Sequence, residues 1–333
     1  MEKNKLKKIN LSIINKKSIG IYVVILVSLY IAIYVVPSVT GALVRTYTVE
    51  YGNLQVTDET TGYFVRTEDV YLATESGKEN RYIEQGTLVR KGTTILEING
   101  QAEGEIGEKY TPILTNLKGE TKSSSDYISG MEGVVSYYAD GYESTFTPSN
   151  MKDITYDMVE KISDIQVLSL KRTKVIKGEP VFKMVHNGRW YLVCFVDTVN
   201  KDRYQIDNQI EIGFNDDQIT AKVHDVIAQG NKTMIILSTN RYYENFDRYR
   251  ATDVTLITSD NSGLIVENSS IATKKGQQGV YVKNKMDEYV FTPISVITTD
   301  GEKSVAEKSY FYDENGEMVS TINTYDEILK SPK

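Results

Sequence analysis

The chain has 333 residues, of which 40% are hydrophobic and 25% charged, so it is long enough for two or three folded domains and lacks the composition of a disordered protein. Its formal net charge of −7 argues against the broad basic surface that nucleic-acid binding requires. The single cysteine, Cys194, excludes an internal disulfide framework and any multi-cysteine metal site.

The first 18 residues form a basic tail. Six lysines stand against one acidic residue, Glu2, which gives this segment a charge of +5 and leaves −12 for the rest of the chain. Because basic flanks of a membrane span stay inside the cell, residues 1–18 are predicted to be a cytoplasmic tail.

An uncharged apolar run follows over residues 19–36, and neutral residues continue it to Val44. As a helix, residues 19–36 span about 27 Å, close to the roughly 30 Å hydrocarbon core of a bilayer. We therefore expect a transmembrane helix over residues 19–42 that places the protein in the cytoplasmic membrane as a single-pass protein, with the N-terminus inside and the C-terminal ectodomain outside. The alternative is a cleaved signal peptide, but the run is longer than the usual h-region of roughly 7 to 15 residues, which favours the uncleaved anchor.

The ectodomain is predicted to be mainly β, because short runs rich in Val, Ile, Tyr and Thr alternate with Gly, Asp and Asn. Two of its segments are nearly alike: residues 84–92 (E-Q-G-T-L-V-R-K-G) and residues 175–184 (V-I-K-G-E-P-V-F-K-M). Each predicts a strand, a turn on glycine and a returning strand. Neither hairpin can bury its apolar face alone, so the two are expected to interlock as halves of one sandwich.

Glycines punctuate both halves at the predicted turns. Those expected to set the hairpins are Gly77, Gly86, Gly92, Gly130, Gly133, Gly141 and Gly178.

The segment between the two halves, residues 99–129, contains several glycines, one proline and a K-S-S-S run. No heptad pattern can be written through it, so it is predicted to be a flexible insertion with at most a turn of helix over residues 112–117. A second helical candidate lies at residues 153–164, where Ile154, Met158 and Ile162 recur at helical spacing and Thr155 or Asp153 can cap the start. We expect it to pack on the sandwich, with docking of a partner as the alternative.

A new group of strands begins at Trp190 and continues through residues 209–214, 219–228 and 234–237, where alternating apolar positions predict half-buried strands. Aromatic and guanidinium groups gather just after it and form a candidate interface: Arg241, Tyr242, Tyr243, Arg248, Tyr249 and Arg250. The alternative, which we favour, is a β-surface that uses the strand propensity and polar tip of tyrosine.

Catalytic and metal-binding patterns are missing from the sequence. Only two histidines exist, His186 in a predicted turn and His224 in a predicted strand, and no carboxylate or cysteine cluster at ligand spacing accompanies them. There is no G-x-S-x-G motif and no phosphate-binding glycine loop, and the run at residues 313–317 predicts a hairpin turn because it lacks EF-hand spacing. We expect no enzymatic activity, no cofactor and no metal.

The order of these motifs resembles the membrane fusion or periplasmic adaptor proteins of the HlyD and RND type. The resemblance runs from Tyr47 to the C-terminus, on the segments V-Y-L-A-T-E-S-G, E-Q-G-T-L-V-R-K-G-T-T-I-L-E-I, G-V-V-S-Y-Y-A-D-G-Y-E and V-I-K-G-E-P-V-F-K-M. It implies a lipoyl-like barrel-sandwich hybrid, a β-barrel and a membrane-proximal β-domain. The implied ranges are 45–98 for the first lipoyl half with leading strands, 99–129 for the insertion, 130–185 for the second half, 186–260 for the barrel, and 261–333 for the membrane-proximal domain and tail.

Three positions test the resemblance further. Many adaptors place a long helical hairpin where this chain has residues 99–129, so the chain resembles a short member from an envelope with a single membrane. Glu267 stands where such proteins usually carry proline, and this departure leaves the turn geometry there open. Lipoyl carrier domains expose a modified lysine at a hairpin tip, whereas Lys183 is predicted within a strand, which disfavours covalent lipoate or biotin.

The resemblance implies an adaptor that assembles with a cytoplasmic-membrane transporter, of the ABC or another class, for export or secretion, and that can form homo-oligomers. The missing hairpin favours an alternative in which the protein is an envelope scaffold that organises cell-wall or cell-division proteins. An extracellular hydrolase or sugar-binding module is the weakest of the three hypotheses.

Overall fold

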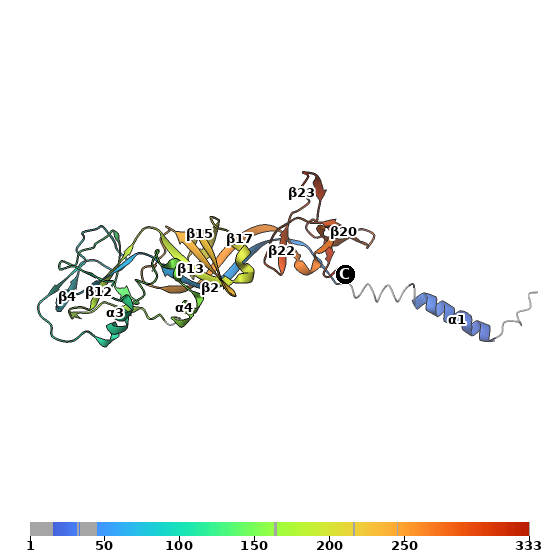
Figure 1. The fold of residues 1–333 in the computed structure, drawn as a ribbon. Helices are drawn as coiled ribbons and strands as arrows, with labels where there is room; N and C mark the ends of the chain where they lie inside the picture. Colours follow the sequence, from blue (N-terminus) through green and yellow to red (C-terminus); the bar gives the residue numbers. More distant parts are fainter. Residues whose placement is uncertain are drawn as a thin grey trace, which may run out of the picture. The chain divides into compact units, whose positions relative to one another are not determined.

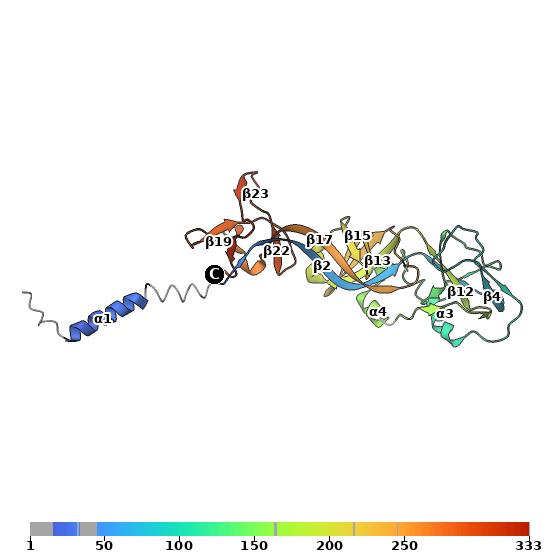
Figure 2. The ribbon, with the colours of Figure 1, turned by 180° about the vertical axis from the view of Figure 1, so that it is seen from behind.

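The computed structural model describes residues 16–31, 33, 45–162, 165–215, 217–244 and 246–332. The chain forms two compact units: one is Gln55–Asp260, and the other combines Met1–Leu54 with Asn261–Lys333. Two long strands, β2 (Glu50–Val65) and β17 (Ala251–Glu267), contribute residues to both units (Figures 1 and 2).

The N-terminal helix α1 spans Lys16–Tyr30. Among the described residues, no helix combines the length and the apolar character needed to cross a bilayer. Residues 1–15, 32 and 34–44 lie outside the described residues, and with them most of the predicted tail and much of the predicted span over 19–42.

The sandwich is built from both halves of the predicted repeat. One sheet has the order β5-β8-β12-β3-β7, and a second sheet has the order β11-β4-β6. The strands of the first sheet are β3 (Glu68–Leu72), β5 (Leu88–Val89), β7 (Lys122–Ser123), β8 (Gly133–Ser136) and β12 (Pro180–His186). Those of the second are β4 (Gly77–Arg81), β6 (Leu96–Asn99) and β11 (Lys174–Val175). Strands β9 (Tyr138–Ala139) and β10 (Leu168–Ser169) form a separate two-stranded sheet.

The two halves interlock, as predicted. Strand β4 of the first half pairs with β11 of the second, and β5 pairs with β8. Side chains from both halves, such as Ile95, Leu96, Val175 and Phe182, share one buried core. Burial of this shared apolar surface is therefore what holds the halves together.

The two repeated turns have the same geometry. Gly92 and Gly178 both have φ of 89°, a left-handed conformation that costs glycine little because it has no Cβ. The backbone N–H of Gly92 donates to the carbonyl of Ser129 at 2.8 Å, and that of Gly178 donates to the carbonyl of Ala73 at 2.8 Å. The first turn is thus pinned to the end of the segment 99–129, and the second turn is pinned to the first half of the sandwich.

The other predicted glycines divide into two groups. Gly86 and Gly141 also have positive φ. Gly77, Gly130 and Gly133 do not, and they are needed for a different reason: a Cβ on Gly133 would lie 2.3 Å from a backbone oxygen, and the other two sites are almost as close. These three permit close approach of neighbouring chain segments instead of setting a turn.

Part of the insertion is helical and packed, which its composition does not predict. A 3₁₀ turn (Glu108–Tyr110) leads into helix α3 (Thr111–Leu117), close to the predicted turn at 112–117. Tyr110, Ile113 and Leu117 fall on one face of this segment and are buried against Val70 and Leu170 of the sandwich. These three buried side chains anchor the segment to the sandwich, and the glycine-rich composition of residues 99–129 gave no indication of them.

The β-barrel includes one strand, β2, that the predicted range 186–260 did not contain. Its order is β14-β15-β16-β13-β2-β17, and pairing of β14 with β17 completes the circle. The four contiguous strands are β13 (Trp190–Asp197), β14 (Gln209–Gly213), β15 (Gln218–Gln229) and β16 (Lys232–Thr239), with a 3₁₀ segment (Thr198–Arg203) after β13. The alternation predicted at Ile210 and Ile212 is confirmed, since both side chains point into the barrel core.

Helix α4 (Tyr156–Lys161) begins after a 3₁₀ turn (Met151–Asp153) and is capped by Thr155, whose hydroxyl accepts from the backbone N–H of Met158 at 3.2 Å. The cap was expected, but the packing was not. The helix packs on the barrel and not on the sandwich. Val159 is buried with the apolar side chains of Phe195 and Met234, which lie on the outer face of the barrel. Residues 163 and 164 of the predicted helix lie outside the described residues.

The C-terminal unit has its own core. One sheet has the order β1-β25-β19-β18, with β20 beside β19. These strands are β1 (Thr46–Thr48), β18 (Ala272–Lys274), β19 (Gln277–Lys283), β20 (Tyr289–Pro293) and β25 (Glu327–Leu329). The others are β21 (Val296–Thr299), β22 (Lys303–Ala306) and the hairpin β23 (Tyr310–Tyr312) with β24 (Met318–Ser320), and a 3₁₀ turn spans Asn268–Ser270.

Pairing of β1 with β25 corrects the predicted first half. Tyr47 lies opposite Ile328, so the strand at residues 46–48 belongs with the C-terminal domain and not with the lipoyl half that starts at β3. Tyr47 also accepts a 2.7 Å hydrogen bond from the backbone N–H of Glu267, the position where the family usually has proline. Proline has no N–H, so this bond depends on the departure from the family pattern.

Candidate functional site at the junction of sandwich and barrel

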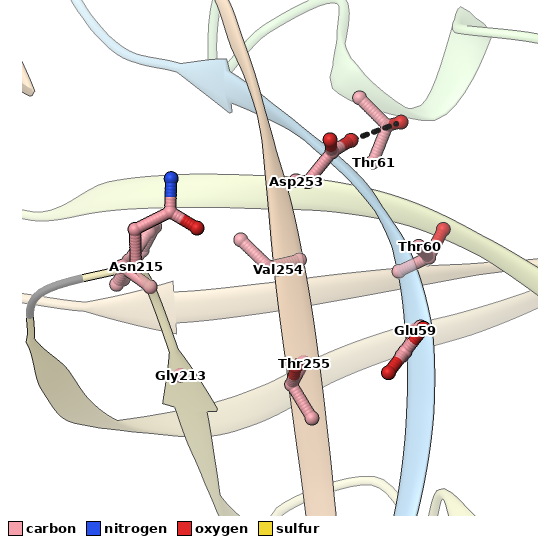
Figure 3. A pocket seen from close by; sticks show the side chains of 9 residues that line it. Glu59, Thr60, Thr61, Gly213, Asn215, Asp253, Val254 and Thr255 are labelled. Carbon is pink, nitrogen blue, oxygen red and sulfur yellow. Dashed lines mark hydrogen bonds between the residues drawn. The ribbon is translucent and has the colours of Figure 1, made fainter.

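The surface of the barrel has a polar depression that could bind a ligand. It has a volume of about 410 Å³ and is lined by residues that include Glu59, Asn215 and Asp253 (Figure 3). Thr61 donates to the Asp253 carboxylate at 3.2 Å. Across the described part of the chain, no three His, Cys, Asp or Glu side chains are placed to hold a metal.

The two histidines have structural settings. His186 accepts from the backbone N–H of Gly188 at 3.0 Å and so forms part of the predicted hairpin turn. The ring centre of His224 on β15 lies 5.2 Å from that of Tyr191 on β13, across the intervening strand β16.

The loop between β16 and β17, residues 240–250, lies against the sandwich. Gln85 of the sandwich donates to the carboxylate of Asp247, and the hydroxyl of Ser136 donates to the Asp247 carbonyl at 3.1 Å. The guanidinium of Arg248 lies 4.5 Å from the ring centre of Tyr138. We call this loop, together with the sandwich residues that contact it, the junction.

Charged side chains are buried at the junction, three positive and three negative. This buried charge cluster consists of Arg66, Glu68, Asp140, Glu143, Lys183 and Arg250. Burial of a charge is costly unless it is paired, so the positions of the partners decide whether the junction is stable.

Glu68 on β3 lies at the centre of the cluster. Its Oε1 is 2.8 Å from Nε of Arg66 and 2.7 Å from Nζ of Lys183, and its Oε2 is 2.6 Å from Nη2 of Arg250. Three cations from β12, from the end of β2 and from the start of β17 therefore converge on one carboxylate.

Arg250 connects the two domains directly. Its Nε lies 3.0 Å from Oδ2 of Asp140, which follows β9 of the sandwich. Its Nη1 donates to the carbonyl of Phe64 on barrel strand β2 at 3.1 Å. One guanidinium thus bonds to the sandwich through Glu68 and Asp140, and to the barrel through Phe64.

Glu143 shapes the loop at the edge of the cluster. It lies 3.4 Å from Nζ of Lys183 and accepts from the backbone N–H groups of Asp140 at 3.0 Å and Gly141 at 2.9 Å. Burial and the neighbouring Asp140 carboxylate raise the pKa of Glu143.

The pKa values of the buried charged groups are shifted in different directions. Burial alone would raise the pKa of Glu68, but Arg250, Arg66 and Lys183 together outweigh it and hold the pKa below its usual range. Burial lowers the pKa of Arg66, and the nearby Glu68 only partly opposes this. For Arg250, burial is outweighed by Asp140 and Glu68, so its pKa is raised. Glu68 and Arg250 are therefore held as a charged pair.

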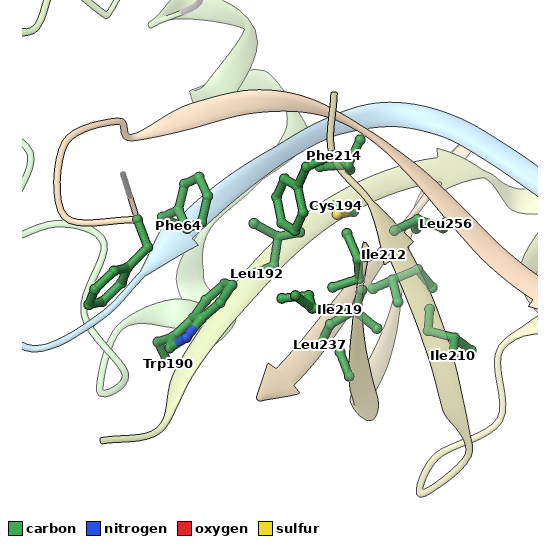
Figure 4. Packing of buried hydrophobic residues seen from close by; sticks show 14 of the residues in the cluster. Phe64, Trp190, Leu192, Cys194, Ile210, Ile212, Phe214, Ile219, Leu237 and Leu256 are labelled. Atoms are coloured by element: carbon green, nitrogen blue, oxygen red, sulfur yellow. The ribbon is translucent and has the colours of Figure 1, made fainter. Parts of the chain in front are cut away.

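An apolar pocket of about 280 Å³ opens at the junction, and we call it the junction pocket. Its lining includes Leu88, Val134, Trp190, Arg241, Tyr242 and Phe246. Trp190 and Phe246 are buried at its base, whereas Leu88 and Tyr242 are 56% and 64% exposed. Figure 4 shows Trp190 beside Phe64 at one end of the barrel core.

The structure separates the six residues predicted as an interface. Arg250 is only 1% exposed, Tyr243 stacks on Phe214 with ring centres 4.0 Å apart, and Arg248 covers Tyr138. Arg250 and Arg248 contact the sandwich, and Tyr243 packs against the barrel core, so these three side chains are engaged within the protein. Arg241, Tyr242 and Tyr249 are exposed.

Sequence reasoning missed the buried charge cluster. One signal was present: Lys183 interrupts the otherwise apolar strand V-F-K-M-V. From the sequence, Lys183 stood out only as a candidate for cofactor attachment. Its side chain is fully buried and ion-paired, which is the wrong setting for a carrier lysine.

Comparison with known proteins gives two adjacent family matches. The model of the RND-related barrel-sandwich hybrid domain matches residues 68–186, and that of the RND-related β-barrel domain matches residues 190–260. Together they cover more than half of the chain. No curated protein matched the sequence in the comparison.

Solved structures show weaker similarity. MacA from Actinobacillus actinomycetemcomitans is 13% identical with a TM-score of 0.39, over 86% of this chain and all of MacA. ZneB from Cupriavidus metallidurans is 10% identical with a TM-score of 0.28, over 87% of this chain and 92% of ZneB. The membrane fusion protein Spr0693 from Streptococcus pneumoniae R6 is 9% identical with a TM-score of 0.25, over 62% of this chain and 98% of Spr0693.

The structural scores are too low to carry an argument, so the assignment rests on the two family matches. They fall on the interlocked sandwich and on the closed barrel, with the junction between them. Over residues 68–260 the chain therefore belongs to the RND-related family, with its barrel-sandwich hybrid domain followed by its β-barrel domain.

Proposed function

We propose that this protein is a membrane-anchored extracytoplasmic adaptor that assembles with a cytoplasmic-membrane transporter in export or secretion. The observation that carries the proposal is the consecutive pair of RND-related domains at residues 68–186 and 190–260. The uncharged run at residues 19–36 would supply the anchor. The protein would act by binding and positioning partners, not by catalysis.

Chain connectivity supports a specific orientation. Strand β1 begins at Thr46, shortly after the apolar run, and pairs with β25 near the C-terminus. The backbone N–H of Lys330 donates to the carbonyl of Arg45 at 2.9 Å. The domain that contains β1 and β25 is therefore the first folded part after the anchor, and we propose that it provides the contact with the transporter.

Photocrosslinking in cells tests this contact. Tyr312 and Tyr325 are 65% and 77% exposed in the C-terminal unit, and Tyr82 is 55% exposed in the sandwich. Each is replaced singly by p-benzoylphenylalanine in the full chain, which changes a tyrosine least. We expect a transporter subunit to be recovered, by mass spectrometry, from positions 312 or 325 more than from the matched control at 82. Recovery of no transporter from any position would contradict the adaptor role.

A scaffold that organises cell-wall or cell-division proteins is the second candidate. Helix α3 has seven residues, and residues 99–129 contain no second helix that could form a long hairpin with it. Without such a hairpin the chain lacks the extension by which many adaptors contact an exit duct. Recovery of only wall or division proteins in the same crosslinking experiment would favour the scaffold.

The proposed topology can be tested with cysteine labelling, because the one native thiol, Cys194, is buried and should not react with the label. Cys194 lies in the barrel core, and burial raises the pKa of its thiol, which keeps it protonated and unreactive. We expect Lys285→Cys, at an exposed site, to react in intact cells with a membrane-impermeant maleimide. Lys5→Cys should react only after permeabilisation, and the parent chain in neither case. The reverse pattern for the two variants would contradict the proposed orientation.

A further inference from the structure

The junction pocket combines an apolar base with a cation at its edge. We propose that it binds a small amphiphilic anion, an alkyl or aryl carboxylate whose apolar part enters the pocket and whose carboxylate pairs with Arg241. This binding is independent of the adaptor role, since it requires no transporter.

The apolar base is preformed by both domains of one compact unit. Sandwich strands supply Leu88 and Val134, and the barrel supplies Trp190 and Phe246. The indole N–H of Trp190 donates to the carbonyl of Arg241 at 2.9 Å, so its polar group is satisfied and its ring remains available for apolar contact. Burial of an apolar group against such a surface is the driving force expected for binding.

The aromatic rings around the base form a continuous contact. The ring centres of Trp190 and Phe246 lie 6.2 Å apart, and those of Phe246 and Tyr242 lie 5.9 Å apart in an edge arrangement. The volume of about 280 Å³ is just below the roughly 300–1,000 Å³ typical of ligand pockets. The site therefore suits a single chain or ring and not a large polycyclic ligand.

Charge selects an anion. Arg241 is exposed and has no ion pair to a described side chain, whereas the neighbouring Arg250 is fully paired within the buried charge cluster. Two carboxylates act on Tyr242 of the pocket wall and, after burial, raise its pKa: Asp247, which is buried and accepts from Gln85, and Glu244. Arg241 is the cation that lines the pocket. A guanidinium without a counter-ion beside an apolar base is the arrangement that recognises a carboxylate with an apolar tail.

Trp190 makes the test specific, because it is the only tryptophan in the chain. The full-length protein in a neutral detergent is titrated with 8-bromooctanoate, whose bromine quenches tryptophan fluorescence on contact. We expect saturable quenching that octanoate reverses by competition and that octanol reverses much less well at the same concentration.

Variants test each part of the proposed site. Arg241→Gln should weaken binding of 8-bromooctanoate about tenfold, the loss expected for one charge-assisted contact. Leu88→Ala should weaken it about threefold, because part of the apolar wall is removed. The matched control is Arg90→Gln, an exposed arginine on the same sandwich hairpin that does not line the pocket, and it should bind as the parent does.

Three outcomes would overturn the proposal. Quenching that rises linearly without saturation would show collisions and not a site. Equal competition by octanol and octanoate, or an unchanged affinity in Arg241→Gln, would show that the pocket does not select an anion. The emission spectrum of each variant without ligand confirms that Trp190 keeps its surroundings, so a loss of binding is not a loss of folding.

Discussion

Replacement of Arg250 by methionine is expected to lower the free energy of unfolding by about 3–5 kcal/mol, the cost of removing one partner from a buried ion pair. The substitution leaves Glu68 and Asp140 buried without the guanidinium that bonds both of them. It also leaves the carbonyl of Phe64 without its donor. Methionine fills much of the same space, so lost volume contributes little to the effect.

Chemical denaturation of the full-length protein measures this effect, followed by the fluorescence of Trp190 in the same compact unit. Arg241→Met is the matched control, because it removes an exposed arginine from the same loop, and we expect a change within about 0.5 kcal/mol. A loss below about 1 kcal/mol in Arg250→Met would contradict the view that this residue holds the barrel on the sandwich.

Glu68→Gln is expected to be as severe at neutral pH and to depend on pH in a defined direction. The change leaves Arg66, Lys183 and Arg250 around a neutral amide, so about 3–5 kcal/mol of stability should be lost at about pH 7. The pKa of Glu68 in the folded protein lies below its ordinary value of 4.5. The stability that its ionised form contributes is therefore complete above 4.5 and is lost as the pH falls through the folded pKa.

The difference in stability between parent and Glu68→Gln should consequently shrink as the pH is lowered below about 4.5. Glu143 works in the opposite sense: its pKa is raised, so its protonation on acidification favours the folded state. The charge of Glu68 is one cause of this raised pKa, so the contribution is smaller in Glu68→Gln, and the difference between the two proteins reports both carboxylates. The exposed Glu75→Gln serves as the control and should change stability little at either pH. A difference for Glu68→Gln that stays constant down to about pH 3 would rule out the assigned role.

Both predictions imply that the junction behaves as a rigid connection and not as a hinge. The loop 240–250 contributes Asp247, Arg248 and Arg250 to contacts with the sandwich, each by a different kind of interaction. Loss of any one would loosen the connection before the separate cores of sandwich and barrel unfold. An adaptor that holds its partners at a fixed distance and orientation would require such a rigid connection.

The sandwich could be predicted because its signals are local. The two glycine turns are readable in a few residues each, and both adopt the expected left-handed conformation at Gly92 and Gly178. The cap at Thr155 and the alternation at Ile210 and Ile212 depend on neighbours within the same segment, and they too were correct. Local backbone chemistry and apolar spacing act over short distances, so a single sequence displays them.

Three features were decided by the tertiary structure alone. Strand β1 joined the C-terminal domain and β2 joined the barrel, because edges far away in the sequence offered them partners. Tyr110, Ile113 and Leu117 turned a glycine-rich insertion into a packed segment. From its own segment, Arg250 is expected to be a surface arginine among tyrosines. It is buried because its partners come from far away in the sequence: Asp140 is 110 residues away and Phe64 is 186 residues away. Whether a charge is buried depends on what folds over it, and no property of its own segment reveals that.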